Sequence, residues 1–307
     1  MSIIIKGEEH WTYKESVKLF MWEKYGQISK SSRGTILFVH GSSMPSQPTF
    51  DLQVVGRPYS SAMDWFVERG FNVWCCDMEG YGRSDKSRQI NCDINNGVDD
   101  LKAVTDYIQN LRQCGPLLIY GISSGSLRAA VFAERYPERV KRLALDAFVW
   151  TGEGSPTLEQ RKKKLADFVA NYRRPIDKAF IYSIFERDHP DTADKPTIEA
   201  FADAILKLDD SVPTGTYVDM CSKLPIVEPT KILSPTIIMR GEFDGIAGMN
   251  DLINFFLLLP NSDKQFAVMP GISHASFQQK NYLLVYDILY AFFTQASPVY
   301  NPNQIII

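Results

Sequence analysis

PLLIYGISSGSLRAAVFAERY, residues 116–136, is the stretch that decides the fold. Its first six residues, 116–121, are mostly apolar and predict a buried β-strand, while the apolar spacing over 126–136 predicts a helix. Between them GISSG matches the pattern G-x-S-x-G, with Ser123 at its centre. A strand that turns directly into a helix holds such a serine hydroxyl clear of the sheet, beside the positive end of the helix dipole. The stretch therefore predicts a nucleophilic serine at the end of a strand.

Strand-like and helical patterns alternate on both sides of this stretch. The expected strands are 35–40, 71–77, 116–121, 140–148, 236–241 and 264–270, and the expected helices are 60–69, 99–112, 126–136, 248–257 and 278–294. Such alternation indicates βαβ units, whose right-handed crossovers give a mostly parallel sheet with helices on both faces. A β-hairpin is expected before them, over roughly 3–25. The fold class predicted from the residues is α/β.

The strand pattern stops over residues 150–233. No convincing strand is expected there, and helices are expected at about 157–172, 196–208 and 214–224. This segment is interpreted as a helical insertion after the sixth strand. It predicts a core domain made of 1–149 and 234–307, with 150–233 as a separate helical unit.

Two short motifs open this insertion. TLEQ at 157–160 fits a capping box that begins the first helix. RKKK at 161–164 is interpreted as a solvated helix face rather than an anion-binding site.

A serine hydroxyl is a poor nucleophile until a neighbouring base accepts its proton. The four histidines are His10, His40, His189 and His274. Only His274 follows the last expected strand and precedes the last helix, and reactive groups gather on loops beyond the carboxyl ends of parallel strands. We therefore expect His274 to be the general base.

The third member of such a site is a carboxylate that fixes the tautomer of the histidine. Asp244 lies just past the strand 236–241 and gives the chain order Ser, Asp, His. Asp146 and Glu242 stay open as alternatives, as does a purely turn-forming role for Asp244 before Gly245.

Further motifs resemble the α/β-hydrolase superfamily. They are FVHG (38–41), DMEGYGRSD (77–85), RGEFDGIA (240–247) and GISHASF (271–277). The resemblance runs from about residue 34 to 294 apart from the insertion, which would then be the helical cap of an α/β-hydrolase fold. It implies an oxyanion hole made by the backbone N–H groups of Ser124 and Ser42, with Ser43 as the alternative to Ser42.

The cap would roof the active site and shape the substrate pocket. Candidates for its apolar lining are Phe168, Tyr172, Phe180, Tyr182, Phe185 and Tyr217, although helical spacing favours cap core for most of them. The sequence departs from the commoner family pattern at SSMPSQPTFD (42–51), an unusually long Ser/Pro-rich loop that could narrow the pocket or supply a polar group.

The expected activity is that of a serine hydrolase cleaving a small-molecule carboxylic ester, amide or related acyl bond through an acyl-enzyme on Ser123. No metal or organic cofactor is required. Serine at this position argues against the haloalkane dehalogenases and epoxide hydrolases of the superfamily, which use a carboxylate. A C–C bond hydrolase of aromatic ring-cleavage products, an acyltransferase and a non-catalytic binding protein stay open.

The composition limits the classes of binding partner to be expected. A net charge of −3 from 33 basic and 36 acidic residues gives no electrostatic case for nucleic acid or an anionic membrane, and favours uncharged or mildly charged small substrates. Five cysteines without metal-ligand spacing indicate neither a disulfide framework nor a zinc site. The N-terminus does not read as a signal peptide, so a cytoplasmic protein is expected. The apolar tail QIII (304–307) could serve a homodimer or be a frayed end.

Overall fold

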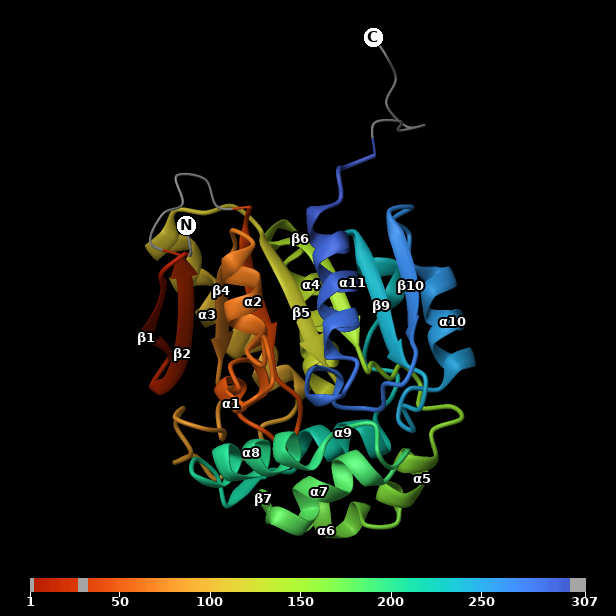
Figure 1. Cartoon of the computed structure of the whole chain (residues 1–307). Coiled ribbons are helices and arrows are strands. Elements are labelled where there is room, and N and C mark those ends of the chain that lie inside the picture. The colour runs from red at the N-terminus through yellow and green to blue at the C-terminus, as the bar shows by residue number, and fades with distance from the viewer. Residues whose placement is uncertain (1–2, 27–32, 299–307) are drawn as a thin grey trace.

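The computed structural model describes residues 3–26 and 33–298, and its main sheet has eight strands in the order β1-β2-β4-β3-β5-β6-β9-β10 (Figure 1). The strands are β1 (Ile5–Lys14), β2 (Val17–Gly26), β3 (Thr35–Val39), β4 (Asn72–Cys76), β5 (Leu117–Ile122), β6 (Val140–Asp146), β9 (Thr236–Gly241) and β10 (Lys264–Met269). The β1–β2 and β2–β4 pairs are antiparallel, and the other neighbours are parallel. The expected hairpin and the mostly parallel sheet are confirmed. The tail 304–307 lies outside the described residues.

Helices cover both faces of this sheet. They are α1 (Ser46–Phe50), α2 (Ala62–Glu68), α3 (Ile94–Arg112), α4 (Ser124–Arg135), α10 (Met249–Leu258) and α11 (Tyr282–Thr294), with short 3-10 turns at Pro137–Arg139, Pro229–Lys231 and Ser276–Gln278. In Figure 1, α2 and α11 cross the face nearer the viewer. None of the described helices is long and apolar enough to cross a membrane.

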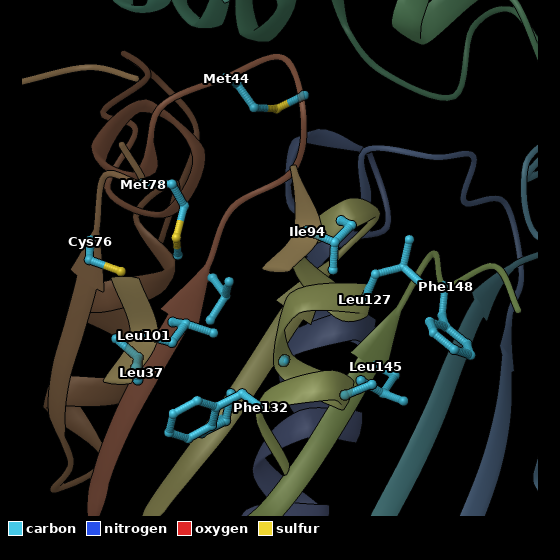
Figure 2. Close-up of a cluster of buried hydrophobic side chains, with 14 of the residues drawn as sticks. Leu37, Met44, Cys76, Met78, Ile94, Leu101, Leu127, Phe132, Leu145 and Phe148 are labelled. Atoms are coloured by element: carbon cyan, nitrogen blue, oxygen red, sulfur yellow. The ribbon is translucent and has the colours of Figure 1, made fainter. Parts of the chain in front are cut away.

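Successive strand residues point to opposite faces, so each buried strand contributes to two cores. Leu37 of β3 packs in the cluster that contains residues of α3 and α4, such as Leu101 and Phe132 (Figure 2). Its neighbour Phe38 packs in the other cluster, with residues of α2 and α11. Burying each such side chain contributes about 1.5–3 kcal/mol. Strands buried on both sides are therefore apolar along their length, which is why the sequence shows continuous runs there.

The insertion lies across the end of the sheet to which the parallel strands run (Figure 1). Its helices are α5 (Pro156–Lys162), α6 (Leu165–Ala170), α7 (Lys178–Glu186), α8 (Lys195–Leu206) and α9 (Gly215–Ser222). The cluster that contains Leu37 continues into it through residues such as Leu158 and Phe201. Because the buried cluster is shared, the division into a core domain and a cap stays a prediction.

Several details of the insertion differ from the sequence expectations. Two short strands, β7 (Arg173–Pro175) and β8 (Ser211–Pro213), pair antiparallel, although no strand was expected. The expected helix 157–172 is broken into α5 and α6, and α7 was not expected.

The capping box at 157–160 is also wrong. The N-cap of α5 is Ser155, whose hydroxyl accepts from the N–H of Leu158, and Pro156 opens the helix. Proline suits the first helical position because it has no N–H to satisfy there.

The segment 42–51 is not simply a loop, because α1 forms within it. The carboxylate of Asp77 accepts from the backbone N–H and the hydroxyl of Ser46, both at 2.7 Å, and from the N–H of Arg83 at 2.9 Å. A Cβ on Gly82, which has φ +53°, would lie 2.1 Å from that carboxylate. The turn at 77–85 therefore anchors the start of α1, and its glycine lets the backbone close around Asp77.

Candidate active site

Ser123 lies at the junction of β5 and α4 in a strained conformation. Its φ of 58° and ψ of −124° are rare for a residue other than glycine and cost about 1–3 kcal/mol. The turn is held from the neighbouring strand: the N–H of Ser123 donates to the carbonyl of Asp146 at 2.9 Å. The hydroxyl of Ser126 donates to the same carbonyl and to that of Gly121, both at 2.7 Å. These bonds fix the backbone that presents the Ser123 hydroxyl.

The two glycines of the motif are required by close backbone contacts. A Cβ on Gly121 would lie 2.5 Å from the carbonyl oxygen of Gly125, and a Cβ on Gly125 would lie 2.2 Å from that of Val39. No side chain fits at either position without moving a strand. The G-x-S-x-G pattern is thus a packing requirement of this turn.

The structure brings Ser123, His274 and Asp244 together at the carboxyl end of the sheet. His274 follows β10, and its Nε2 lies 2.9 Å from the Ser123 hydroxyl oxygen. Asp244 follows β9, and both of its carboxylate oxygens lie 3.1 Å from Nδ1 of His274. Asp244 and His274 are buried. Residues 151 positions apart in the sequence therefore form one hydrogen-bonded chain.

Charge fixes the direction of these hydrogen bonds. Burial raises the pKa of the Asp244 carboxyl, but His274 and the backbone N–H groups of Ile246 and Ala247 outweigh it and lower the pKa to about 2. An ionised Asp244 can only accept, so Nδ1 of His274 carries a hydrogen and Nε2 faces Ser123 as an acceptor. This is the tautomer that can take the hydroxyl proton.

The rival carboxylates have other partners. Asp146 accepts from the hydroxyl of Tyr120 at 2.5 Å. Burial raises the pKa of Asp146 to about 7, although the hydrogen bond from Tyr120 lowers it in part. Glu242 accepts from the N–H of Gly271. Among the described residues, neither carboxylate is hydrogen-bonded to His274.

The other histidines lie elsewhere. Nε2 of His40 accepts from the N–H of Met78 at 3.0 Å, and its Nδ1 donates to the carbonyl of Gly41 at 2.7 Å. Burial, with the nearby charge of Arg128, lowers the pKa of His40 to about 3. His40 is therefore a neutral side chain that orients the chain at Gly41. His10 bonds to Glu23, and His189 stacks on Phe243.

The expected oxyanion donors lie on either side of the Ser123 turn. Ser124 begins α4, so its N–H is one of the first-turn groups that have no partner within the helix. Ser42 follows Gly41, and its hydroxyl donates to that of Ser124 at 2.7 Å. Its carbonyl accepts from the hydroxyl of Tyr81. The two serines are thus adjacent, and their roles as N–H donors remain a prediction.

A narrow hollow of about 30 Å³ opens over Ser123 and His274. Ser42 and Ser43 line it on the sheet side, and Arg161, Arg187 and Tyr217 line it on the insertion side. These last three residues also line an adjoining hollow of about 630 Å³ within the insertion.

Three of the six aromatic candidates line the hollows. Phe168 and Phe180 line the larger one, and Tyr217 lines both. Phe185 is buried against Phe201, while Tyr172 is exposed.

The arginines beside the hollow were not predicted from the sequence. The interpretation of 161–164 as a solvated face is wrong for Arg161, although Lys162, Lys163 and Lys164 are exposed. A signal was present: Arg161 is three residues beyond Leu158, so the two share one side of α5, and Leu158 is fully buried.

One group of side chains among the described residues could hold a metal ion, and it lies in the N-terminal hairpin. It consists of Glu8, His10 and Glu23. Both carboxylate oxygens of Glu23 already accept from Arg112. The arrangement is therefore that of a buried ion pair, away from Ser123.

Comparisons with known proteins identify the family and the fold. A sequence model of the family described as "Serine aminopeptidase, S33" matches residues 30–281. The proline iminopeptidase of Neisseria meningitidis serogroup A / serotype 4A (strain DSM 15465 / Z2491) is 29% identical over 130 residues, which cover 38% of this chain and 41% of that protein. The chain therefore matches less than half the length of this relative.

Solved structures resemble the chain over most of its length. One is E-2-(acetamidomethylene)succinate hydrolase, with TM-score 0.70, 15% identity and coverage of 94% of this chain and 100% of that one. Another is 2-hydroxy-6-oxo-6-phenylhexa-2,4-dienoate hydrolase from Rhodococcus sp. strain RHA1, with TM-score 0.68, 15% identity and coverage of 95% and 100%. At this identity the likeness concerns the fold. From the family match and the shared fold, the chain is an α/β-hydrolase of the serine aminopeptidase S33 family.

Proposed function

We propose that this chain is a serine hydrolase that cleaves a carboxylic ester, amide or related acyl bond of a small molecule through an acyl-enzyme on Ser123. The observation that carries the proposal is the contact of 2.9 Å between the Ser123 hydroxyl and Nε2 of His274, with Asp244 on the opposite ring nitrogen. Nucleophile, base and orienting acid are the minimum set for this chemistry.

The reaction divides into two acyl transfers. His274 takes the proton from Ser123 as its oxygen attacks the substrate carbonyl, and the N–H groups of Ser124 and Ser42 stabilise the oxyanion. His274 then returns the proton to the leaving group, which departs as an alcohol or amine. In the second half His274 takes a proton from water, whose oxygen attacks the acyl-enzyme. The bond to the Ser123 oxygen then breaks, His274 returns the proton to that oxygen, and the carboxylic acid leaves.

The arrangement of the hollows supports a small substrate. The space over Ser123 is narrow, and the adjoining volume of about 630 Å³ falls within the range of small-molecule sites. The proposal places a short acyl or leaving group beside Ser123 and the remainder of the substrate in the larger hollow.

A substrate panel tests the proposal. Wild type and Ser123→Ala are compared on p-nitrophenyl esters, aminoacyl p-nitroanilides including that of proline, lactones and ring-cleavage dienones. We expect ester or amide hydrolysis in wild type and a loss of roughly 10⁴-fold or more in Ser123→Ala. Equal rates for the two proteins would contradict the acyl-enzyme, and turnover of the dienones alone would replace it with C–C bond hydrolysis.

A further inference from the structure

Three arginines of the insertion gather around Tyr217, although they come from different elements. Arg161 lies on α5, Arg174 on β7, and Arg187 at the end of α7, while Tyr217 lies on α9 (Figure 1). The guanidinium carbons of Arg161 and Arg174 each lie 4.2 Å from the centre of the Tyr217 ring. Arg161 and Arg187 line the hollow that contains Ser123, and all three arginines line the larger one.

Only one of these charges is neutralised. Arg187 pairs with Asp188, with Nε to oxygen at 2.8 Å. Arg161 and Arg174 form no ion pair with any carboxylate among the described residues. Arg174 is only 9% exposed, and its Nε has no hydrogen-bond partner. Burying a guanidinium without a counter-ion costs free energy of folding. Two such arginines beside a cavity therefore indicate that another molecule supplies the negative charge.

The remaining contacts of Arg174 connect this charge to the sheet side of the site. Arg174 donates to the hydroxyl of Ser43 at 2.6 Å and to the carbonyl of Ser42 at 3.3 Å. The hydroxyls of Ser43 and Tyr217 lie 3.3 Å apart. Arg174 is therefore held in place by neutral acceptors. The guanidinium of Arg161 lies over the Tyr217 ring and has no hydrogen bond or ion pair with any other described residue.

The electrostatics of Tyr217 agree with an excess of positive charge. Burial raises the pKa of the Tyr217 hydroxyl, but Arg161 and Arg174 outweigh it and lower the pKa to about 8. Burial also lowers the pKa of Arg161; Tyr217 raises it in part, and the neighbouring charges of Arg187 and Arg174 lower it further. A bound anion would relieve this repulsion.

We propose that Arg161 binds an anionic group of the substrate, a carboxylate or a phosphate, with Arg174 and Tyr217 completing the site. The guanidinium of Arg161 can donate two parallel hydrogen bonds to such a group. This inference rests on the proposed function, because it places the anion on the molecule whose acyl bond Ser123 attacks. The local charge of the pocket thus differs from the net charge of −3, which favours uncharged or mildly charged substrates.

Matched p-nitrophenyl esters measure the preference of the enzyme for an anionic over a neutral substrate. Mono-p-nitrophenyl glutarate carries a free carboxylate, and its methyl ester is the neutral counterpart. A p-nitrophenyl ester that carries a phosphate at similar reach is the third substrate, and it separates the two anion classes. We expect kcat/KM in wild type to favour at least one anionic ester over the neutral ester by roughly tenfold or more. Arg161→Gln should reduce that ratio by roughly ten- to hundredfold.

The matched control is Lys163→Gln, which removes the same charge from an exposed position two residues further along the chain, at the C-cap of α5. Its ratio should equal that of wild type. A ratio near one in wild type, or an equal fall in Arg161→Gln and Lys163→Gln, would overturn the proposal, because long-range charge alone would then explain the effect.

A binding measurement tests the anion site independently of the proposed hydrolysis. In the Ser123→Ala protein, glutarate and inorganic phosphate are compared with neutral glutaramide by ligand-observed NMR. We expect at least one anion to bind more tightly than glutaramide, and Arg161→Gln in that background to raise its Kd by roughly ten- to hundredfold. No preference for an anion would overturn the inference even if Ser123 hydrolyses the neutral ester. If wild type hydrolyses none of the esters, amides and lactones of the substrate panel while the anion binds through Arg161, the proposed reaction fails and the anion site stands.

Discussion

The end of the sheet that carries Ser123 and the helical insertion that covers it are built in different ways. At the sheet end, close backbone contacts restrict which residues can be present. Gly121 and Gly125 have no space for a Cβ, and Ser123 is held at a positive φ. In the insertion, short helices and two short strands bring Arg161 and Tyr217 together by side-chain packing. The difference teaches that the proposed chemistry rests on a few positions dictated by the backbone, while the proposed selectivity for an anion rests on side chains that come from scattered elements.

The largest expected effect distinguishes two carboxylates at the sheet end. Asp244→Asn should lower kcat by roughly 10⁴-fold, because an amide at this position no longer fixes the His274 tautomer or stabilises the imidazolium. Asp146→Asn should lower kcat by less than about tenfold, because the Asp146 carboxylate bonds to Tyr120 rather than to His274. Steady-state kinetics on one ester measure both. A reversed order would make Asp146 the orienting acid.

The second effect tests whether the backbone dictates the turn. Gly125→Ala should destabilise the protein by about 3 kcal/mol or more, because the new Cβ would lie 2.2 Å from the Val39 carbonyl oxygen. Gly115→Ala is the matched control, since nothing lies within 4 Å of a Cβ there. Urea unfolding midpoints compare the two. Similar midpoints would mean that the turn can relax, and the contrast with the insertion would weaken.

A third effect concerns the pH dependence of stability at the sheet end. The pKa of Asp146 is raised to about 7 in the folded protein, from an ordinary value of 3.8. The folded state therefore holds a proton that the unfolded state has lost. The contribution of Asp146 protonation to the free energy of unfolding is complete below pH 3.8. It is lost as the pH rises to about 7, at about 1.4 kcal/mol per pH unit.

Asp146→Asn removes this titration. The free energy of unfolding of wild type minus that of the variant should therefore fall between pH 5 and pH 6.5, as measured by urea unfolding at each pH. A difference that stays constant over this range would show that Asp146 is ionised in the folded protein.

The smallest effect tests the insertion. Ser155→Ala should destabilise the protein by about 1 kcal/mol, because the N–H of Leu158 loses its acceptor at the start of α5. Ser155→Gly should destabilise it by only about a few tenths of a kcal/mol, because glycine is also tolerated at an N-cap. Thermal unfolding compares the variants. An equal loss in the glycine and alanine variants would assign the effect to the bond between the Ser155 hydroxyl and the Gly245 carbonyl instead.

The sequence predicts the sheet end well because local rules apply there. Buried parallel strands are continuously apolar, and the turn at Ser123 requires glycines at fixed spacing, so both leave patterns in a single sequence. His274 could be singled out because only four histidines are present. Asp244 was chosen from the sequence by its position just past a strand and by the chain order, but Asp146 at the end of its own strand stayed open. The distances of 3.1 Å from Asp244 to Nδ1 of His274 distinguish the two.

The insertion was predicted less well for a physical reason. Strands β7 and β8 have three residues each, too few for an alternating pattern to appear. Ser43 and Tyr217 are 174 positions apart, so no local rule connects them. Arg161 was also missed, although a local signal existed: its spacing from buried Leu158 places it on the inner side of α5.

The central claim is that Ser123 is the nucleophile activated by His274. Labelling with a fluorophosphonate, followed by mass spectrometry of the peptide that spans 116–136, tests it directly. We expect one adduct on Ser123 in wild type, none in Ser123→Ala and a much slower reaction in His274→Gln. An adduct on the neighbouring Ser124, or labelling of Ser123 at an unchanged rate without His274, would contradict the account.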